Sequence, residues 1–190
     1  MARERKFTKE ALYEITKSTL LHHGYDGFTI GKAAKQLKVS RGTIYKYFDN
    51  KEELITEYML YEMEKFLVEL KEINACQGFQ AQFEFLLDII LQDSETHQVR
   101  SLVFNIPAVS DKVKTNLKQL KELHQDMYRY LQDFVDLGRE EKVLKQTIPD
   151  SLILAFIFQT VDIPNHFHVP EEEWKISIKE IIGHGMFTKN

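Results

Sequence analysis

Apolar residues recur at intervals of three and four along almost the whole chain, and this periodicity restricts the fold more than any other feature. Glycine and proline, which interrupt helices, occur only 8 and 4 times in 190 residues. No stretch alternates between apolar and polar residues for long enough to predict a β-strand. We therefore predict an all-α fold with helices throughout.

Charge divides the chain into two parts. The first 55 residues hold 11 of the 25 basic side chains and 7 of the 29 acidic ones, a net charge of +4 that leaves −8 for the remainder. A basic part of this kind is typical of a segment that meets a polyanion. We predict an N-terminal domain at residues 1–50 and a larger helical domain at 51–190.

Three short helices are predicted in the basic part, and the last two are separated only by the turn "LKVS". The first helix is predicted to begin at Thr8, its N-cap, and to end at Gly24, the second to cover 30–37 and the third 41–48. Asp49 and Asn50 offer caps for a fourth helix that reaches about residue 70. Two short helices joined by such a turn describe a helix-turn-helix, in which the second helix of the pair is presented to a partner.

The third helix has little to bury. Ile44 and Phe48 lie four residues apart and are predicted to face the core, and Ser40 is predicted to cap the backbone N–H of Gly42 or Thr43. DNA explains the outward side chains, because Arg and Lys bind guanine edges or phosphates, Thr contacts the thymine methyl and Tyr reaches phosphate. The alternative is an ordinary solvated helix face. The outward set is Arg41, Thr43, Tyr45, Lys46 and Tyr47.

Three segments, "HHGYDGFTI", "AAKQLKVSRGTIYKYF" and "NKEEL", follow one another in an order and spacing that resembles the TetR/AcrR family of one-component transcriptional regulators. The match covers about residues 7–54, and the remainder resembles the family only in length and helical character. The resemblance implies a double-stranded DNA operator as partner. It implies that the base-reading positions are among Arg41, Gly42, Thr43, Tyr45 and Lys46, and that Thr29, Tyr45, Tyr47 and Lys51 touch phosphates. Ser40, the residue before the third helix, is also a DNA-binding candidate.

Three positions depart from the family pattern. Lys38 replaces the usual Gly of the turn, Tyr47 replaces a frequent His, and Gly31 stands where some relatives carry a base-contacting Arg. A positive φ at Lys38 would strain the turn by ~1 kcal/mol, and Gly31 is expected to remove one base contact. Lys51 suits an anion independently of the family, because it stands at a helix N-terminus.

The acidic part is predicted to form a homodimer. Further helices are expected near 79–92, 95–105, 110–140, 149–163 and 170–186. The segment "SLILAFIF" is apolar on every face, so a helix formed by it must be buried on two sides. In a monomer of this size, neighbouring helices bury only one of the two sides. We therefore predict that 152–159 and 174–182 pair with a second copy of the chain.

A small apolar effector is also predicted for this part. On the helix expected over 110–140, His124 is the only polar member of an apolar stripe, and aromatic and Met side chains dominate small-molecule pockets. Two plainer readings stay open: His124 is a core or rim residue, and the apolar set is ordinary core. The candidate ligand residues are Met63, Phe83, Phe104, His124 and Tyr128.

Other protein classes find less support. The close histidine pairs at 22–23 and 166–168 lack carboxylates at a metal-binding spacing, and no nucleophile motif or phosphate-binding glycine loop occurs. We expect no enzyme, no metal and no cofactor. No apolar run approaches the ~20 residues needed to cross a membrane, so a cytoplasmic protein is expected.

The function predicted from the sequence is a DNA-binding transcriptional regulator, most simply a repressor released from a pseudo-palindromic operator by a small apolar ligand. The alternative is a dimeric DNA-binding adaptor without an effector.

Overall fold

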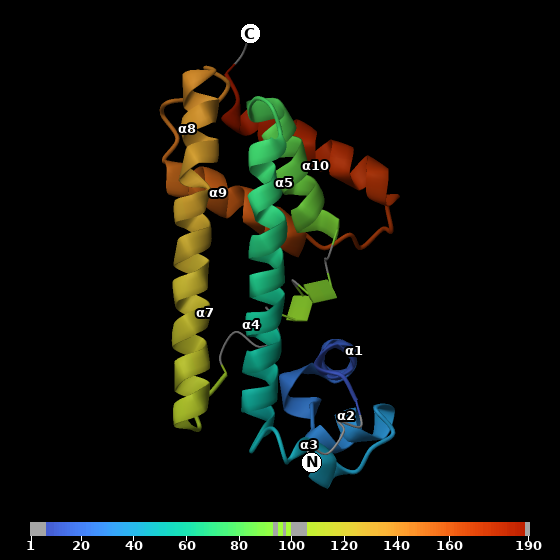
Figure 1. Ribbon diagram of the computed structural model, residues 1–190. Helices are drawn as coiled ribbons and strands as arrows, with labels where there is room; N and C mark the ends of the chain where they lie inside the picture. Colours follow the sequence, from blue (N-terminus) through green and yellow to red (C-terminus); the bar gives the residue numbers. More distant parts are fainter. Residues whose placement is uncertain (1–6, 93–94, 97, 100–105, 189–190) are drawn as a thin grey trace. The chain divides into compact units, whose positions relative to one another are not determined.

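A computed structural model of the chain describes residues 7–92, 95–96, 98–99 and 106–188, which are predominantly helical (Figure 1). Within these residues there is no strand, only one antiparallel bridge between Leu144 and Phe187. The all-α prediction is confirmed. The helices are α1 (Lys9–Gly27), α2 (Ile30–Gln36), α3 (Arg41–Ile44), α4 (Lys51–Leu70), η1 (Lys71–Ala75), α5 (Phe79–Gln92), α7 (Asp111–Tyr130), α8 (Gln132–Glu140), α9 (Asp150–Gln159), η2 (Thr160–Asp162) and α10 (Glu171–Met186).

Two of the longer predicted helices are divided. The helix expected over 110–140 is interrupted at Leu131, whose backbone N–H still bonds the Met127 carbonyl while its own carbonyl accepts from Val135. The interruption is therefore a local change of conformation between α7 and α8. The helix expected over 149–163 ends at Gln159 and continues as the 3-10 segment η2. Most of the helix expected over 95–105 lies outside the described residues.

Two compact units make up the chain. One contains residues 1–65 and 95–123, and the other contains 66–94 and 124–190. The helices α4 and α7 each begin in the first unit and end in the second. The boundary predicted at 50/51 does not coincide with this division, because the N-terminal parts of both helices pack with the first three. A functional boundary at 50/51 stays a prediction.

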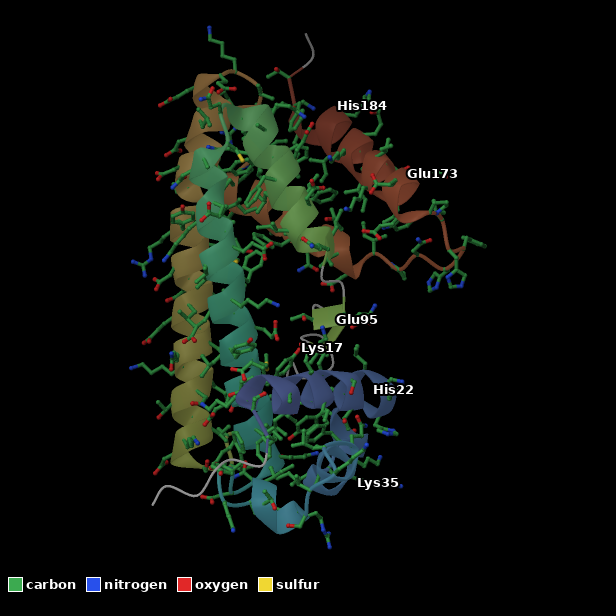
Figure 2. All side chains as sticks on the ribbon, turned by 45° about the vertical axis from the view of Figure 1, so that its right-hand side comes forward. Lys17, His22, Lys35, Glu95, Glu173 and His184 are labelled. Atoms are coloured by element: carbon green, nitrogen blue, oxygen red, sulfur yellow. The ribbon has the colours of Figure 1, made fainter. Side chains whose placement is uncertain are left out.

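The first unit is built around α1. Its N-terminus is capped as predicted, since the Thr8 hydroxyl accepts from the Ala11 N–H at 3.1 Å. Gly24 interrupts the helix with a left-handed backbone, φ +64°, so the regular part ends where the sequence predicted. A salt bridge of 3.7 Å joins Lys17 of α1 to Glu95 (Figure 2).

The core of this unit joins α1, α2 and α3 to α4 and α7. Its members are buried apolar side chains that come from segments far apart in the sequence. They include Leu12, Leu20, Phe28, Ile30, Ala33, Ala34, Ile44, Phe48, Leu54, Ile55, Tyr58 and Val113.

An aromatic cluster forms the core of the second unit. Phe79 of α5 stacks on Phe134 of α8 with ring centroids 4.9 Å apart, and the edge of Phe187 meets Phe79 at 5.6 Å and Phe83 at 5.2 Å. The chain following α8 is held by Arg139, which donates to the carbonyls of residues 145 and 148 and to Asp150. The cluster therefore ties α5, α8 and the C-terminal residues together.

The helix α9 buries only part of its apolar surface. Ile153, Leu154, Ile157 and Phe158 are buried, whereas Leu152 and Phe156 are 54% and 44% exposed. On α10, Ile176 and Ile181 are 64% and 63% exposed. None of the helices in the described ranges is long and apolar enough to cross a membrane.

Gly138 provides a test of the aromatic core. A Cβ atom there would lie 2.6 Å from atoms of Phe79 and Leu144, closer than a packed core tolerates. We expect Gly138→Ala to lower the free energy of unfolding by ~1–3 kcal/mol in urea denaturation, less the small gain from the better helix former. Gly185→Ala is the control, because its Cβ meets nothing within 4 Å. Equal stability of the two variants would contradict this close packing.

Candidate nucleic-acid interface

The turn between α2 and α3 contains a lysine whose backbone adopts the left-handed conformation. Lys38 has φ +56°, the conformation for which glycine is the usual residue. The backbone compensates in part, because the N–H groups of Lys38 and Val39 bond the carbonyls of Lys35 and Ala34. The positive φ considered from the sequence is confirmed, and its cost is ~1 kcal/mol. The turn keeps the Lys38 side chain exposed beside α3.

The helix α3 is shorter than predicted. It ends at Ile44, and the chain then turns through Tyr45 to Tyr47 before reaching Phe48. The predicted inward pair is nevertheless confirmed, since Ile44 is 0% and Phe48 3% exposed. Both anchors lie in one core, so even a helix of four residues has a fixed orientation.

The expected cap of α3 is absent. Ser40 makes no side-chain hydrogen bond to the helix backbone; its hydroxyl pairs with the Thr43 hydroxyl at 2.9 Å instead. The Thr43 N–H bonds the Ser40 carbonyl, also at 2.9 Å. Because the backbone donor is already satisfied, the Ser40 hydroxyl is available to the neighbouring side chain.

The outward face of the motif carries two cations without partners. Arg41, Tyr45 and Lys46 are exposed, and within the part of the chain that the structure describes none of the three side chains has a hydrogen-bond or ion-pair partner. Gly42 is exposed beside them, and Thr43 is half-buried. Tyr47 is exposed but not free, because its ring meets the edge of Phe7 at 5.8 Å. Arg41, Tyr45 and Lys46 can therefore turn toward a ligand without breaking a side-chain hydrogen bond or ion pair.

The other predicted contacts have structural roles as well. Thr29 caps α2 by accepting from the Lys32 N–H at 3.2 Å. Lys51 donates to the Tyr25 carbonyl at 2.9 Å and lies 4.0 Å from the centroid of the Tyr25 ring. Burial, together with the hydrogen bond that Tyr25 donates to Glu52, raises the pKa of the Tyr25 hydroxyl, which stays a neutral donor. Lys51 is thus held at the start of α4 with further N–H donors left over.

Position 31 on α2 was expected only to lack a contact. Its missing side chain leaves space for Arg41: a Cβ built on Gly31 would lie 3.1 Å from Arg41 Cδ and 3.8 Å from Arg41 Cγ. Sequence reasoning missed this proximity because the two residues belong to different helices. Lys35 on α2 also projects into solvent, as Figure 2 shows, and was not among the predicted contacts.

A buried carboxylate joins this motif to the start of α7. Glu53 is 3% exposed and accepts hydrogen bonds from the Asp49 N–H at 3.1 Å and from the Ser110 hydroxyl at 2.9 Å. Asn50 accepts from the Glu53 N–H at 2.8 Å, the helix cap that the sequence predicted. Burial acts to raise the pKa of Glu53, but these hydrogen bonds and the nearby Lys112 charge lower it below its ordinary value.

Two more polar contacts run alongside. Asn116 donates to the Thr56 hydroxyl at 2.9 Å in a buried position. Lys112 pairs with Glu57 at 2.5 Å, and this hydrogen bond raises the Lys112 pKa although burial opposes it. We call these contacts the α4–α7 joint. It comprises Glu53, Thr56 and Glu57 of α4 with Ser110, Lys112 and Asn116 at the start of α7.

The predicted effector residues do not form one group in the described structure. Phe83 belongs to the aromatic cluster, whereas Tyr128 contacts His124 at 5.1 Å and Phe158 at 6.1 Å between ring centroids. His124 is exposed. Met63 belongs to the other compact unit, and Phe104 lies outside the described residues. In the described parts of the chain, no group of three or more His, Cys, Asp or Glu side chains could hold a metal ion.

Comparison with known proteins relates this geometry to a family. Residues 12–58 match the sequence profile described as "Bacterial regulatory proteins, tetR family". The chain is 26% identical over 152 residues to the uncharacterized HTH-type transcriptional regulator YhgD of Bacillus subtilis (strain 168), covering 78% of this chain and 77% of the relative. It is 24% identical over 154 residues to IcaR of Staphylococcus aureus (strain Newman), the HTH-type negative transcriptional regulator of the biofilm operon icaADBC, covering 78% and 80%.

The fold has close counterparts among solved structures. The ketosteroid transcriptional regulator KstR2 of Mycobacterium tuberculosis matches with a TM-score of 0.75 and 14% sequence identity, covering 100% of this chain and 98% of that one. At this identity the likeness shows the fold alone.

The lowered pKa of Glu53 predicts how stability depends on pH. A carboxylate whose pKa is lower in the folded chain stabilises it above its unfolded pKa of ~4.3, and this contribution disappears as the pH falls through the folded pKa. We expect Glu53→Gln to lower the free energy of unfolding by ~1–3 kcal/mol at pH 7. The difference from the wild type should shrink below about pH 4. Urea denaturation across this range measures it.

Glu69→Gln, an exposed carboxylate of the same helix, is the control and should change stability little at any pH. A difference between Glu53→Gln and the wild type that stays constant down to about pH 3 would show that the Glu53 charge does not contribute.

Proposed function

Since this chain belongs to the TetR family of transcriptional regulators, we propose that it represses its target genes from a pseudo-palindromic operator, which it leaves when a small apolar molecule binds. The observation that carries the proposal is the contrast on α3 and the turn after it. Ile44 and Phe48 are buried, while Arg41, Tyr45 and Lys46 are exposed. Polar side chains presented on a rigid support can enter a major groove.

Each outward side chain has a role in this proposal. Arg41 and Lys46 are free to bond guanine edges, and the Tyr45 hydroxyl is free to reach a phosphate. Lys51 is held by Tyr25 at a helix N-terminus, where both its charge and the helix favour an anion. A lysine that the protein holds in place suits the phosphate backbone of DNA, which is the same in every sequence. A side chain that is free to turn suits a base edge.

Alanine variants separate reading from anchoring. Arg41→Ala and Lys46→Ala should each cost ~1–3 kcal/mol on the operator and relax the preference at one position per half-site. Lys51→Ala should weaken operator and random DNA by similar factors and reduce the salt slope by about one unit for each phosphate that the lysine no longer neutralises. Titrations against operator and scrambled duplexes at two salt concentrations measure both effects, after the operator is selected from random DNA.

Lys118→Ala is the matched control, because Lys118 is an exposed lysine of α7 that pairs with Glu122 at 3.6 Å. It should leave DNA binding unchanged. If Arg41→Ala and Lys46→Ala weakened operator and scrambled DNA equally, these residues would anchor rather than read. If the wild type selected no sequence, the proposed function itself would be wrong.

Repression is the direction of regulation that we propose. Its support is that IcaR, with which the chain shares 24% identity, is a negative regulator. A reporter gene placed behind the selected operator tests the direction, since a repressor lowers its expression and an activator raises it.

We propose that the protein acts as a homodimer through α9 and α10. The support is the apolar surface that both helices leave exposed, at Leu152 and Phe156 on α9 and at Ile176 and Ile181 on α10. Exposed apolar residues on adjacent helices are typical of an interface with a second copy. A two-fold axis would then place two α3 helices about one DNA turn apart, ~34–36 Å, on a pseudo-palindromic site.

Phe156→Glu tests the dimer surface. A charge buried at an apolar interface without a partner costs several kcal/mol, so the variant should sediment as a monomer at micromolar concentration while the wild type sediments as a dimer. Val68→Glu is the control, because Val68 is 66% exposed on α4, outside the proposed interface. A wild-type chain that sediments as a stable monomer would contradict the proposal.

A small apolar effector is proposed for the second unit, near His124 and Tyr128. The support is a group of aromatic rings, in which a half-buried Tyr128 contacts both His124 and Phe158. Aromatic side chains are common in small-molecule pockets. An effector must prefer the conformation with badly spaced reading helices, because equal affinity for both states shifts nothing.

The alternative is a dimeric DNA-binding adaptor without an effector. Operator titrations with fatty acids and steroids as probes distinguish the two, because only a sensor loses operator affinity. Any response found should change in His124→Phe; an unchanged response would make His124 a packing residue.

A further inference from the structure

Gly31 is the second residue of α2, and the space beside it is occupied by Arg41. A Cβ at position 31 would lie 3.1 Å from Arg41 Cδ, tighter than an ordinary carbon contact, and 3.8 Å from Arg41 Cγ. The aliphatic stem of Arg41 therefore lies across the bare backbone of α2. The third neighbouring atom, the hydroxyl oxygen of Thr29, is 3.8 Å away, an ordinary distance.

Helix geometry gives no other reason for glycine at this position. Gly31 lies within α2, and its φ is not positive, so alanine could adopt the same backbone. Alanine is also the better helix former. The glycines at 24 and 78 differ in this respect, because both have a positive φ. What sets Gly31 apart is the close approach of a side chain from the next helix.

We propose that Gly31 is a specificity-determining position that acts through Arg41. By leaving room for the stem of Arg41 on α2, it fixes the direction in which the guanidinium leaves the protein surface. The guanidinium itself has no partner among the described residues, so the packing of its stem is what orients it. Bidentate recognition of a guanine edge depends on that direction, because the guanidinium fork is planar and rigid.

This inference rests on the proposed function, since it assigns a role to Gly31 only if the chain reads DNA through Arg41. Position 31 would then set which base Arg41 can reach without touching the base itself. Gly31 is accordingly a positioning residue.

We expect Gly31→Ala to change which DNA sequence the protein prefers and not to change its folding. The atoms near a new Cβ belong to a flexible, exposed side chain, so Arg41 can move while α2 and α3 keep their places. Gly31→Ala should therefore keep the thermal unfolding midpoint of the wild type or exceed it. A redirected guanidinium should lose its base preference while its charge still attracts phosphate.

Selection of bound duplexes from random DNA tests the inference with four proteins. These are the wild type, Gly31→Ala, Arg41→Ala and the double variant. We expect Gly31→Ala to relax or change the preference at the same base pair of each half-site as Arg41→Ala. We then compare the affinity for the operator with the affinity for an operator changed at that base pair. The ratio of the two should fall by about fivefold or more, which is within the range of one bidentate contact. Affinity for scrambled duplexes should change less than about twofold, because the charge of Arg41 is retained.

The double variant decides whether Gly31 acts through Arg41. Once Arg41 is alanine, Gly31→Ala should leave the remaining preference unchanged. A further loss of similar size would overturn the inference, and so would a Gly31→Ala protein that selects the wild-type site with the wild-type ratio. Gly185→Ala controls for a glycine replacement elsewhere in the chain, because its Cβ meets nothing within 4 Å.

Failure of the inference and failure of the proposed function give different results. If the wild type selects an operator and Arg41→Ala alters it, the proposed function stands whatever Gly31→Ala does. If the wild type selects no sequence, the proposed function fails, and the role assigned to Gly31 fails with it.

Discussion

The burial of Ile44 and Phe48 is the constraint on which α3 and the turn after it depend. A helix of four residues cannot persist in water by itself, because nucleation costs more than so few hydrogen bonds return. Both side chains are almost fully buried in a core supplied by α1, α2, α4 and α7. The residues between and around them can therefore be polar without loss of structure, and they are the ones available to a ligand.

The same core makes the helix-turn-helix part of a larger unit. Val113 of α7 belongs to it, and the α4–α7 joint adds buried polar contacts centred on Glu53. Since removing one partner leaves another buried polar group unsatisfied, these contacts specify one arrangement. The two joined helices also continue into the second unit. A shift of α4 therefore reaches the motif along the chain itself, and a shift of α7 reaches it through the α4–α7 joint.

Cations near the motif fall into two kinds. Lys32 and Lys51 donate to backbone carbonyls near the C-terminal end of α1, whereas the side chains of Arg41 and Lys46 have no such partner among the described residues. A lysine that is hydrogen-bonded to the protein keeps its charge in one place. A cationic side chain without a partner can still change rotamer until a ligand binds. Arg41 lies between these cases, since its stem is packed on Gly31 while its guanidinium is free.

The sequence by itself determined the all-α fold, the three-helix motif and the inward pair Ile44 and Phe48, because these follow from the spacing of apolar residues along one segment. It also determined the local caps at Thr8 and Asn50, which need only the next three residues. It misplaced the Ser40 hydroxyl and overextended α3, because a hydroxyl has several partners within reach and helix ends depend on packing.

Only the tertiary structure decided the contacts between residues that are distant in sequence. Lys51 meets Tyr25, Ser110 meets Glu53, and Arg41 lies across Gly31. Such pairs cannot be derived from periodicity, because periodicity states which face of a helix is inward but not which residue of another helix it meets. The sequence thus identified the polar side chains that we propose face DNA, and the packing of neighbouring helices decided which of them are held and which are free.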